Sequence, residues 1–129
     1  EIENYLSKFQ EYSYDYEILE ISDKNYIQKI SSMLDIGFKN AIKKYPLPKK
    51  LSCTYLFKYA DYSHSVSLGN SSNSNHIIWE ININPKLLFG ILKGKYHWDN
   101  AEIGSHIKVR RKPDIYSREA QKLLCFLKI

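Results

Sequence analysis

The stretch KYHWDNAEIGSHIKVRRKPDIY, residues 95–116, gathers most of the side chains in this chain that could do chemistry. His97 and His106 flank two acids, Asp99 and Glu102, which raises the question of a metal site. Zinc needs three or four ligands at about 2.0 to 2.3 Å, often with two of them close in sequence. The spacing here matches no such ligand pattern, so we expect no metal. A structural cluster, whose half-buried polar groups bond one another and the local backbone, is the favoured interpretation.

Covalent and acid–base catalysis have weaker support. Cys53 and Cys125 stand in the apolar segments LSCTYLF and LLCFL, where a cysteine usually acts as a small buried hydrophobe. No serine stands in a G-x-S-x-G elbow, and no spacing rule makes Glu102 and Asp114 an acid and base pair. We therefore expect this chain itself to be non-catalytic, to hold no cofactor and, with reduced thiols, to be cytoplasmic.

The basic run KVRRK, residues 108–112, lies in a segment that is expected to form a strand. Alternation places Lys108, Arg110 and Lys112 on one exposed face and Arg111 on the other. The formal net charge of the chain is +5, so this face is either simply solvated or binds an anion or an acidic partner. Nucleic acid is disfavoured, because such sites cluster their arginines with stacking aromatics.

Length and composition indicate one globular domain. The chain has 129 residues, of which 43% are hydrophobic and 26% charged, and no apolar run approaches the roughly 18 residues of a membrane span. Residues 1–21 are interpreted as an N-terminal extension or linker, and residues 22–129 as the domain. Because the chain opens on Glu1 rather than Met, we expect a longer parent protein with a further region upstream.

Hydrophobic periodicity and turn residues predict an α+β fold. Ser22 is a candidate N-cap for the first helix, and Asn84, Pro85 and Gly94 bracket a short one. The polar run 69–75 is expected to be a hairpin loop within a meander of strands. The expected order is a helix over 22–45, strands over 51–60, 63–69 and 76–83, a helix over 84–94, a strand from Ile103 to Pro113, entered by a long irregular connection, and a helix from Ser117.

This order resembles the sterol carrier protein 2 fold. The pieces that carry the resemblance are PKLLFGILKG, AEIGSHIKVRR and SREAQKLLCFLKI. It implies a mostly antiparallel sheet of about five strands covered by helices on one face. A hydrophobic tunnel can lie between the two layers of that fold.

A second resemblance is more specific. The segment HWDNAEIGSHIKVRRKPDIY is similar to the closing "HWNNAEIGSH-x-x-x-x-R-x-P-x-x-Y" region of some metallo-β-lactamase-fold hydrolases, which include relatives of CMP-N-acetylneuraminate hydroxylase. Asp99 departs from the asparagine of that pattern. The resemblance implies a tail domain that follows the catalytic domain of a metal-dependent hydrolase. The chain itself holds no H-x-H-x-D-H metal motif.

We therefore predict a non-catalytic accessory or dimerisation domain at the C-terminus of such a hydrolase. Its partner would be the parent catalytic domain or a second copy, and Trp98 would anchor the interface because it combines apolar area with a donor. Glu102 is expected to be the central member of the polar cluster. The alternatives are a carrier of a lipid or other amphipathic ligand, which needs a cavity of roughly 300 Å³ or more, and an anion or nucleic-acid module. The predicted binding residues are His97, Trp98, Asn100, Glu102, His106 and Tyr116.

Overall fold

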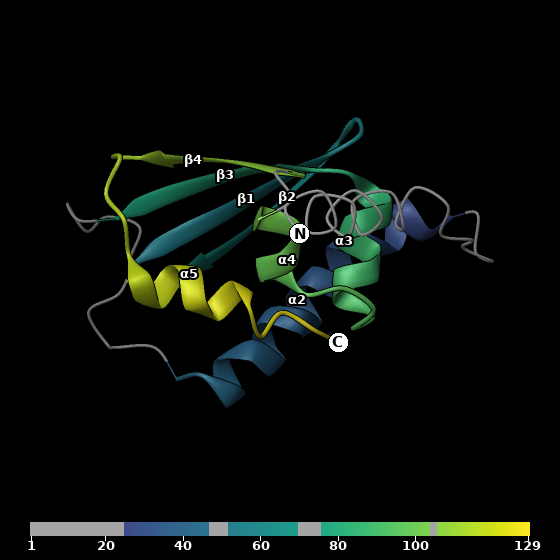
Figure 1. The fold of residues 1–129 in the computed structure, drawn as a ribbon, viewed down its shortest axis with the longest axis horizontal. Helices are drawn as coiled ribbons and strands as arrows, with labels where there is room; N and C mark the ends of the chain where they lie inside the picture. The colour runs from purple at the N-terminus through teal and green to yellow at the C-terminus, as the bar shows by residue number, and fades with distance from the viewer. Residues whose placement is uncertain (1–24, 47–51, 70–75, 104–105) are drawn as a thin grey trace, which may run out of the picture.

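The computed structural model of the chain describes residues 25–46, 52–69, 76–103 and 106–129, without the side chains of Glu102 and Ile103. It confirms an α+β fold with two layers, a sheet and a set of helices packed on one of its faces (Figure 1). The proposed extension 1–21 and the proposed cap Ser22 lie outside the described residues. The elements are α2 (Tyr26–Lys44), β1 (Cys53–Tyr59), β2 (Tyr62–Leu68), β3 (Ile77–Ile83), α3 (Pro85–Leu92), α4 (Trp98–Ile103), β4 (Ile107–Lys112) and α5 (Arg118–Leu124).

The sheet corrects the expected topology. The four strands that the structure describes stand in the order β2-β1-β3-β4, rather than in the order of a meander. β1 and β3 run parallel in the centre, whereas β2 and β4 pair antiparallel at the two edges. Cys53 has Leu68 as its neighbour on one side and Ile77 on the other, so β2 and β3 pair with β1 and not with each other. Residues 70–75 of the expected hairpin loop lie outside the described residues. Alternation of apolar residues identifies a strand but does not identify its neighbour.

The first two strands form an antiparallel pair that turns beside Asp61. Tyr59 and Tyr62 are the last paired residues, so the turn has two residues. Ala60, the first of them, has a φ of 52°. This left-handed backbone is one that two-residue hairpin turns require and that a Cβ atom disfavours.

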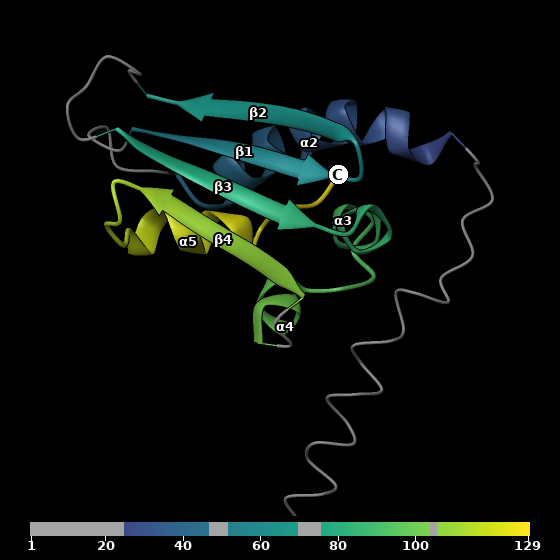
Figure 2. The ribbon, with the colours of Figure 1, turned by 90° about the horizontal axis from the view of Figure 1, so that it is seen from above.

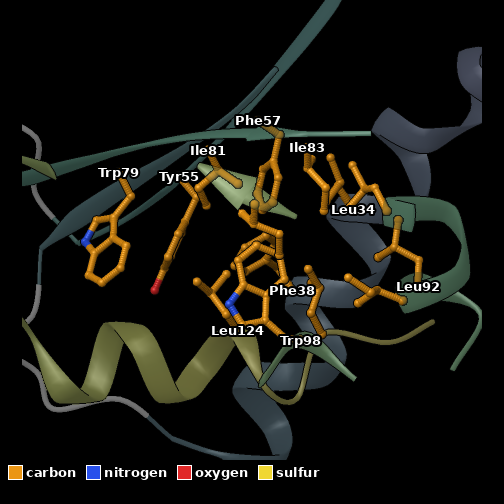
Figure 3. Close-up of a cluster of buried hydrophobic side chains, with 14 of the residues drawn as sticks. Leu34, Phe38, Tyr55, Phe57, Trp79, Ile81, Ile83, Leu92, Trp98 and Leu124 are labelled. Atoms are coloured by element: carbon orange, nitrogen blue, oxygen red, sulfur yellow. The ribbon is translucent and has the colours of Figure 1, made fainter. Parts of the chain in front are cut away.

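The core lies between the sheet and the helices (Figure 3). β1 and β3 alternate regularly, and their inward side chains meet the buried face of α2. The Phe38 ring lies 4.9 Å from the Tyr55 ring and 5.9 Å from the Phe57 ring. These contacts favour a packed core over a tunnel between the layers. The largest completely buried side chains are Trp79, Trp98, Tyr55, Phe38, Phe57, Ile30, Leu34, Ile81, Leu87, Leu88, Leu92 and Leu123.

Two helix starts follow the sequence prediction. Asn84 Oδ1 accepts a hydrogen bond from the backbone N–H of Lys86 at 2.8 Å, and Pro85 begins α3. Ser117 Oγ accepts from the backbone N–H of Ala120 at 3.3 Å at the start of α5. Such side chains satisfy backbone donors that have no partner inside the helix.

The connection before the last strand is helical, which corrects the expected irregular crossing. Trp98 and Ala101 are both buried and stand three residues apart, which is the spacing of one helix face. The backbone N–H of Ala101 donates to His97 O at 3.2 Å, and that of His106 donates to Ala101 O at 3.1 Å. Ile103 therefore closes α4, and the last strand begins only at Ile107. Within the described ranges, no helix has both the length and the apolar character needed to cross a bilayer.

Candidate functional site

The outer face of the sheet is the broadest functional candidate. Every helix of the described chain lies on the other side of the sheet, so this face is open in Figure 2. On β4, Lys108, Arg110 and Lys112 are exposed, while the intervening Val109 and Arg111 are half-buried. The predicted alternation along residues 108–112 is thus confirmed. We call Lys108, Arg110 and Lys112 the basic column.

The next strand adds a carboxylate and an exposed apolar side chain to this face. Glu80 stands directly opposite Arg110 in the register, and its Oε1 accepts from Lys58 Nζ at 2.8 Å. The hydrogen bond and charge of Lys58, and then the charge of Arg110, hold the pKa of Glu80 below its usual range. Ile78 is 43% exposed and pairs with Lys112. A shallow depression runs along this part of β3 and β4, so the face combines positive charge with a small apolar area.

Arg111 points away from the basic column and is part of the fold. Its guanidinium carbon lies 5.5 Å from the centre of the buried Trp79 ring and 5.4 Å from that of Tyr116. Its Nη2 also lies 3.4 Å from Asp114 Oδ1. Such stacking is a cation–π interaction. Tyr116, a predicted binding residue, is 59% exposed. Its stacking with Arg111 gives it a structural role at the end of β4.

A polar network at the start of β1 and β3 went unnoticed in the sequence. His76 Nε2 lies 2.7 Å from Thr54 Oγ1, which lies 2.9 Å from Ser67 Oγ. His76 Nδ1 is hydrogen-bonded to the hydroxyl of the buried Ser52. A serine beside a histidine can act as a nucleophile and base, usually with a third group that orients the base. Here hydroxyl groups occupy both ring nitrogens, so the network serves first to join the strands.

In the sequence, strand alternation places Thr54 and His76 each on the outer face of its own segment. These two side chains come together only if β1 and β3 are neighbours in the sheet. That neighbourhood is set by the parallel register, in which Cys53 pairs with Ile77. The pairing could not be read from the alternation of either strand.

The predicted cluster of residues 97–106 is spread around α4. His97 is exposed just before the helix, Asn100 is exposed on it, and His106 is half-buried between the helix and β4. The side chain of Glu102 lies outside the described residues, and with it the expected hydrogen bonds to His97 or His106. In the part of the chain that the structure describes, no three His, Cys, Asp or Glu side chains form a group able to hold a metal ion.

Trp98 corrects the expectation of an exposed interface anchor. Its side chain is 1% exposed, and its ring lies 6.3 Å from that of Phe57 in an edge-on arrangement (Figure 3). An indole with so little surface adds almost nothing to an interface. Trp98 is therefore a core residue that ties α4 to the sheet.

The two cysteines differ in environment. Cys53 is completely buried, as predicted, and burial raises the pKa of its thiol. Cys125 was expected to face the core as well, but it is half-buried, and its Sγ donates to Asp99 Oδ1 at 3.0 Å. This contact joins the end of α5 to the start of α4, across 26 residues of sequence. Only the tertiary structure brings these segments together.

A scan of protein-family models, a search of curated proteins and a search of solved structures find no match to this chain. The resemblances to the sterol carrier protein 2 fold and to hydrolase tail regions therefore rest on the sequence patterns and stay predictions.

Proposed function

We propose that this chain is an accessory interaction domain that binds an acidic protein surface through the outer face of its sheet. The observation that carries the proposal is the basic column beside the exposed Ile78, on a face that no described helix covers. Complementary charge steers a partner to such a face and fixes its register, while apolar contact at the centre adds affinity.

The composition of the face favours a protein over a nucleic acid. Proteins that bind single strands stack bases on aromatic side chains beside a basic groove. The outward positions of the described strands carry hydroxyl, aliphatic, amide and charged groups, and none is aromatic. Phosphate contacts remain available to the basic column, so a nucleic acid is an outcome that the experiment must separate.

The charge of the face also bears on the choice of protein partner. Two copies that met through this face would bring their basic columns close together, and like charges in close contact are unfavourable. A different, acidic domain is therefore the better partner. The resemblance to hydrolase tail regions supports a metallo-β-lactamase-fold catalytic domain of the same polypeptide as that partner. We place the protein in the cytoplasm, because no disulfide joins Cys53 and Cys125.

The test compares two triple charge reversals. One changes the basic column, as Lys108→Glu, Arg110→Glu and Lys112→Glu. The control changes three exposed lysines outside the sheet, as Lys39→Glu, Lys43→Glu and Lys95→Glu. Both variants alter the net charge equally, so only the position of the charge differs between them.

Binding is measured to poly-L-glutamate and to a single-stranded DNA of similar charge, at low and at physiological salt. The basic-column variant should bind poly-L-glutamate at least about tenfold more weakly, a loss of about 1.4 kcal/mol, and the control should lose far less. Equal losses in both variants would show binding by net charge alone and would overturn the proposal. Tighter binding of the DNA, with the steep salt dependence of phosphate contacts, would replace it with a nucleic-acid function.

A further inference from the structure

A cavity on the helical side of the molecule is separate from the proposed docking face. It has a volume near 320 Å³ and lies where the end of α3, the start of α4 and the C-terminal tail meet. The tail, residues 125–129, runs beside α3, and the backbone N–H of Ile129 donates to Leu92 O at 2.9 Å (Figure 1). The volume lies at the lower end of the range for small-molecule sites.

Part of the wall of this cavity is apolar. Ile91 comes from α3, Trp98 from α4, and Phe126 and Leu127 from the tail. Phe126 is held in place by stacking on Tyr45 of the α2 end, with the ring centres 5.5 Å apart. The apolar part of the wall thus comes from α3, α4 and the tail, and the stacking on Tyr45 holds the tail in place.

Polar groups in the cavity favour an occupant with acceptor oxygens. His97, just before α4, lines the cavity. Lys44 and Lys128 also line the cavity, and neither has a carboxylate partner among the described side chains.

We propose that this cavity binds a small organic carboxylate with an apolar body. The apolar body packs against Ile91, Phe126 and Leu127, and the carboxylate lies near Lys44 and Lys128. The site is independent of the docking face, because none of its lining residues belongs to the sheet. It also differs from a tunnel between the layers, where aromatic side chains fill the space.

Cys125 provides a direct reporter of occupancy. It lines the cavity and is half-buried, whereas Cys53 is completely buried and therefore protected in the folded protein. Alkylation by iodoacetamide, followed by intact mass, thus measures access to Cys125. Sodium decanoate is the charged probe, and decanol is the uncharged probe of equal chain length.

We expect decanoate to slow alkylation of Cys125 and to bind at least about tenfold more tightly than decanol in calorimetric titrations. Lys44→Met and Lys128→Met should each weaken decanoate binding severalfold. Lys43→Met, which removes the same charge from an exposed neighbour outside the cavity, should leave it unchanged. Equal affinity for the two probes, unchanged alkylation at saturating decanoate, or an equal loss in the Lys43 variant would each overturn the proposal.

Discussion

Replacing Tyr55 by phenylalanine tests how the closing helix is held on the sheet. Tyr55 of β1 is completely buried, and its hydroxyl donates to the backbone oxygen of Ala120 in α5 at 2.7 Å. A neutral hydrogen bond contributes about 0.5 to 1.5 kcal/mol net, and a buried group left unpaired costs about 1 to 3 kcal/mol. We expect Tyr55→Phe to lower the free energy of unfolding by about 1 to 2 kcal/mol near neutral pH.

The same variant should change how the free energy of unfolding depends on pH at alkaline pH. Burial, with a smaller contribution from Cys53, raises the pKa of Tyr55 far above its ordinary value. In the unfolded chain this phenol ionises near pH 10, so above that pH the folded state binds more protons and stability falls as pH rises. The stabilisation is therefore complete below about pH 10, and at about pH 11 roughly 1.4 kcal/mol of it is lost. The difference between wild type and Tyr55→Phe should nearly vanish there.

Urea unfolding followed by far-ultraviolet circular dichroism, at about pH 8 and about pH 11, measures both effects. The matched control is Tyr62→Phe, an exposed tyrosine on β2, which should alter stability by less than about 0.5 kcal/mol at the lower pH. The reasoning is refuted if Tyr55→Phe is as stable as the wild type at about pH 8. It is also refuted if the difference between the two proteins is equally large at about pH 11.

Three further predictions concern stability and are measured by thermal and urea unfolding. Ala60→Gly should stabilise the protein by about 0.5 to 1 kcal/mol, because glycine removes the cost of the positive φ at the hairpin turn; an unchanged or lower melting temperature would contradict this. Arg111→Leu should cost about 1 to 2 kcal/mol through the lost stacking on Trp79 and Tyr116, and Arg111→Lys should recover only part of it; full recovery by lysine would show that charge alone matters. Trp98→Ala should lower the free energy of unfolding by about 3 to 5 kcal/mol, because it removes a large buried side chain from the core. A loss below about 1 kcal/mol would instead support the interface role that the sequence suggested for Trp98.

The candidate sites could be predicted only in part. The basic column was predicted, because strand alternation alone decides which side chains of residues 108–112 point outward. Trp98 was misplaced, since its burial depends on a helix that the polar sequence around it did not suggest. The cavity beside Cys125 could not be predicted, because its walls come from α2, α3, α4 and the tail.

By itself the sequence determined the local elements: the α+β class, the helix starts at Asn84 and Ser117, and the antiparallel pairing of β1 with β2. These features depend on side chains acting on backbone groups a few residues away. The tertiary structure decided that β3 pairs with β1, in parallel, and does not pair with β2. This pairing brings His76 within hydrogen-bonding distance of Thr54. It also decided that α4 replaces an irregular crossing, because burying Trp98 against Phe57 outweighs the polar character of the segment. Such choices depend on contacts between residues distant in sequence, which periodicity within one segment does not encode.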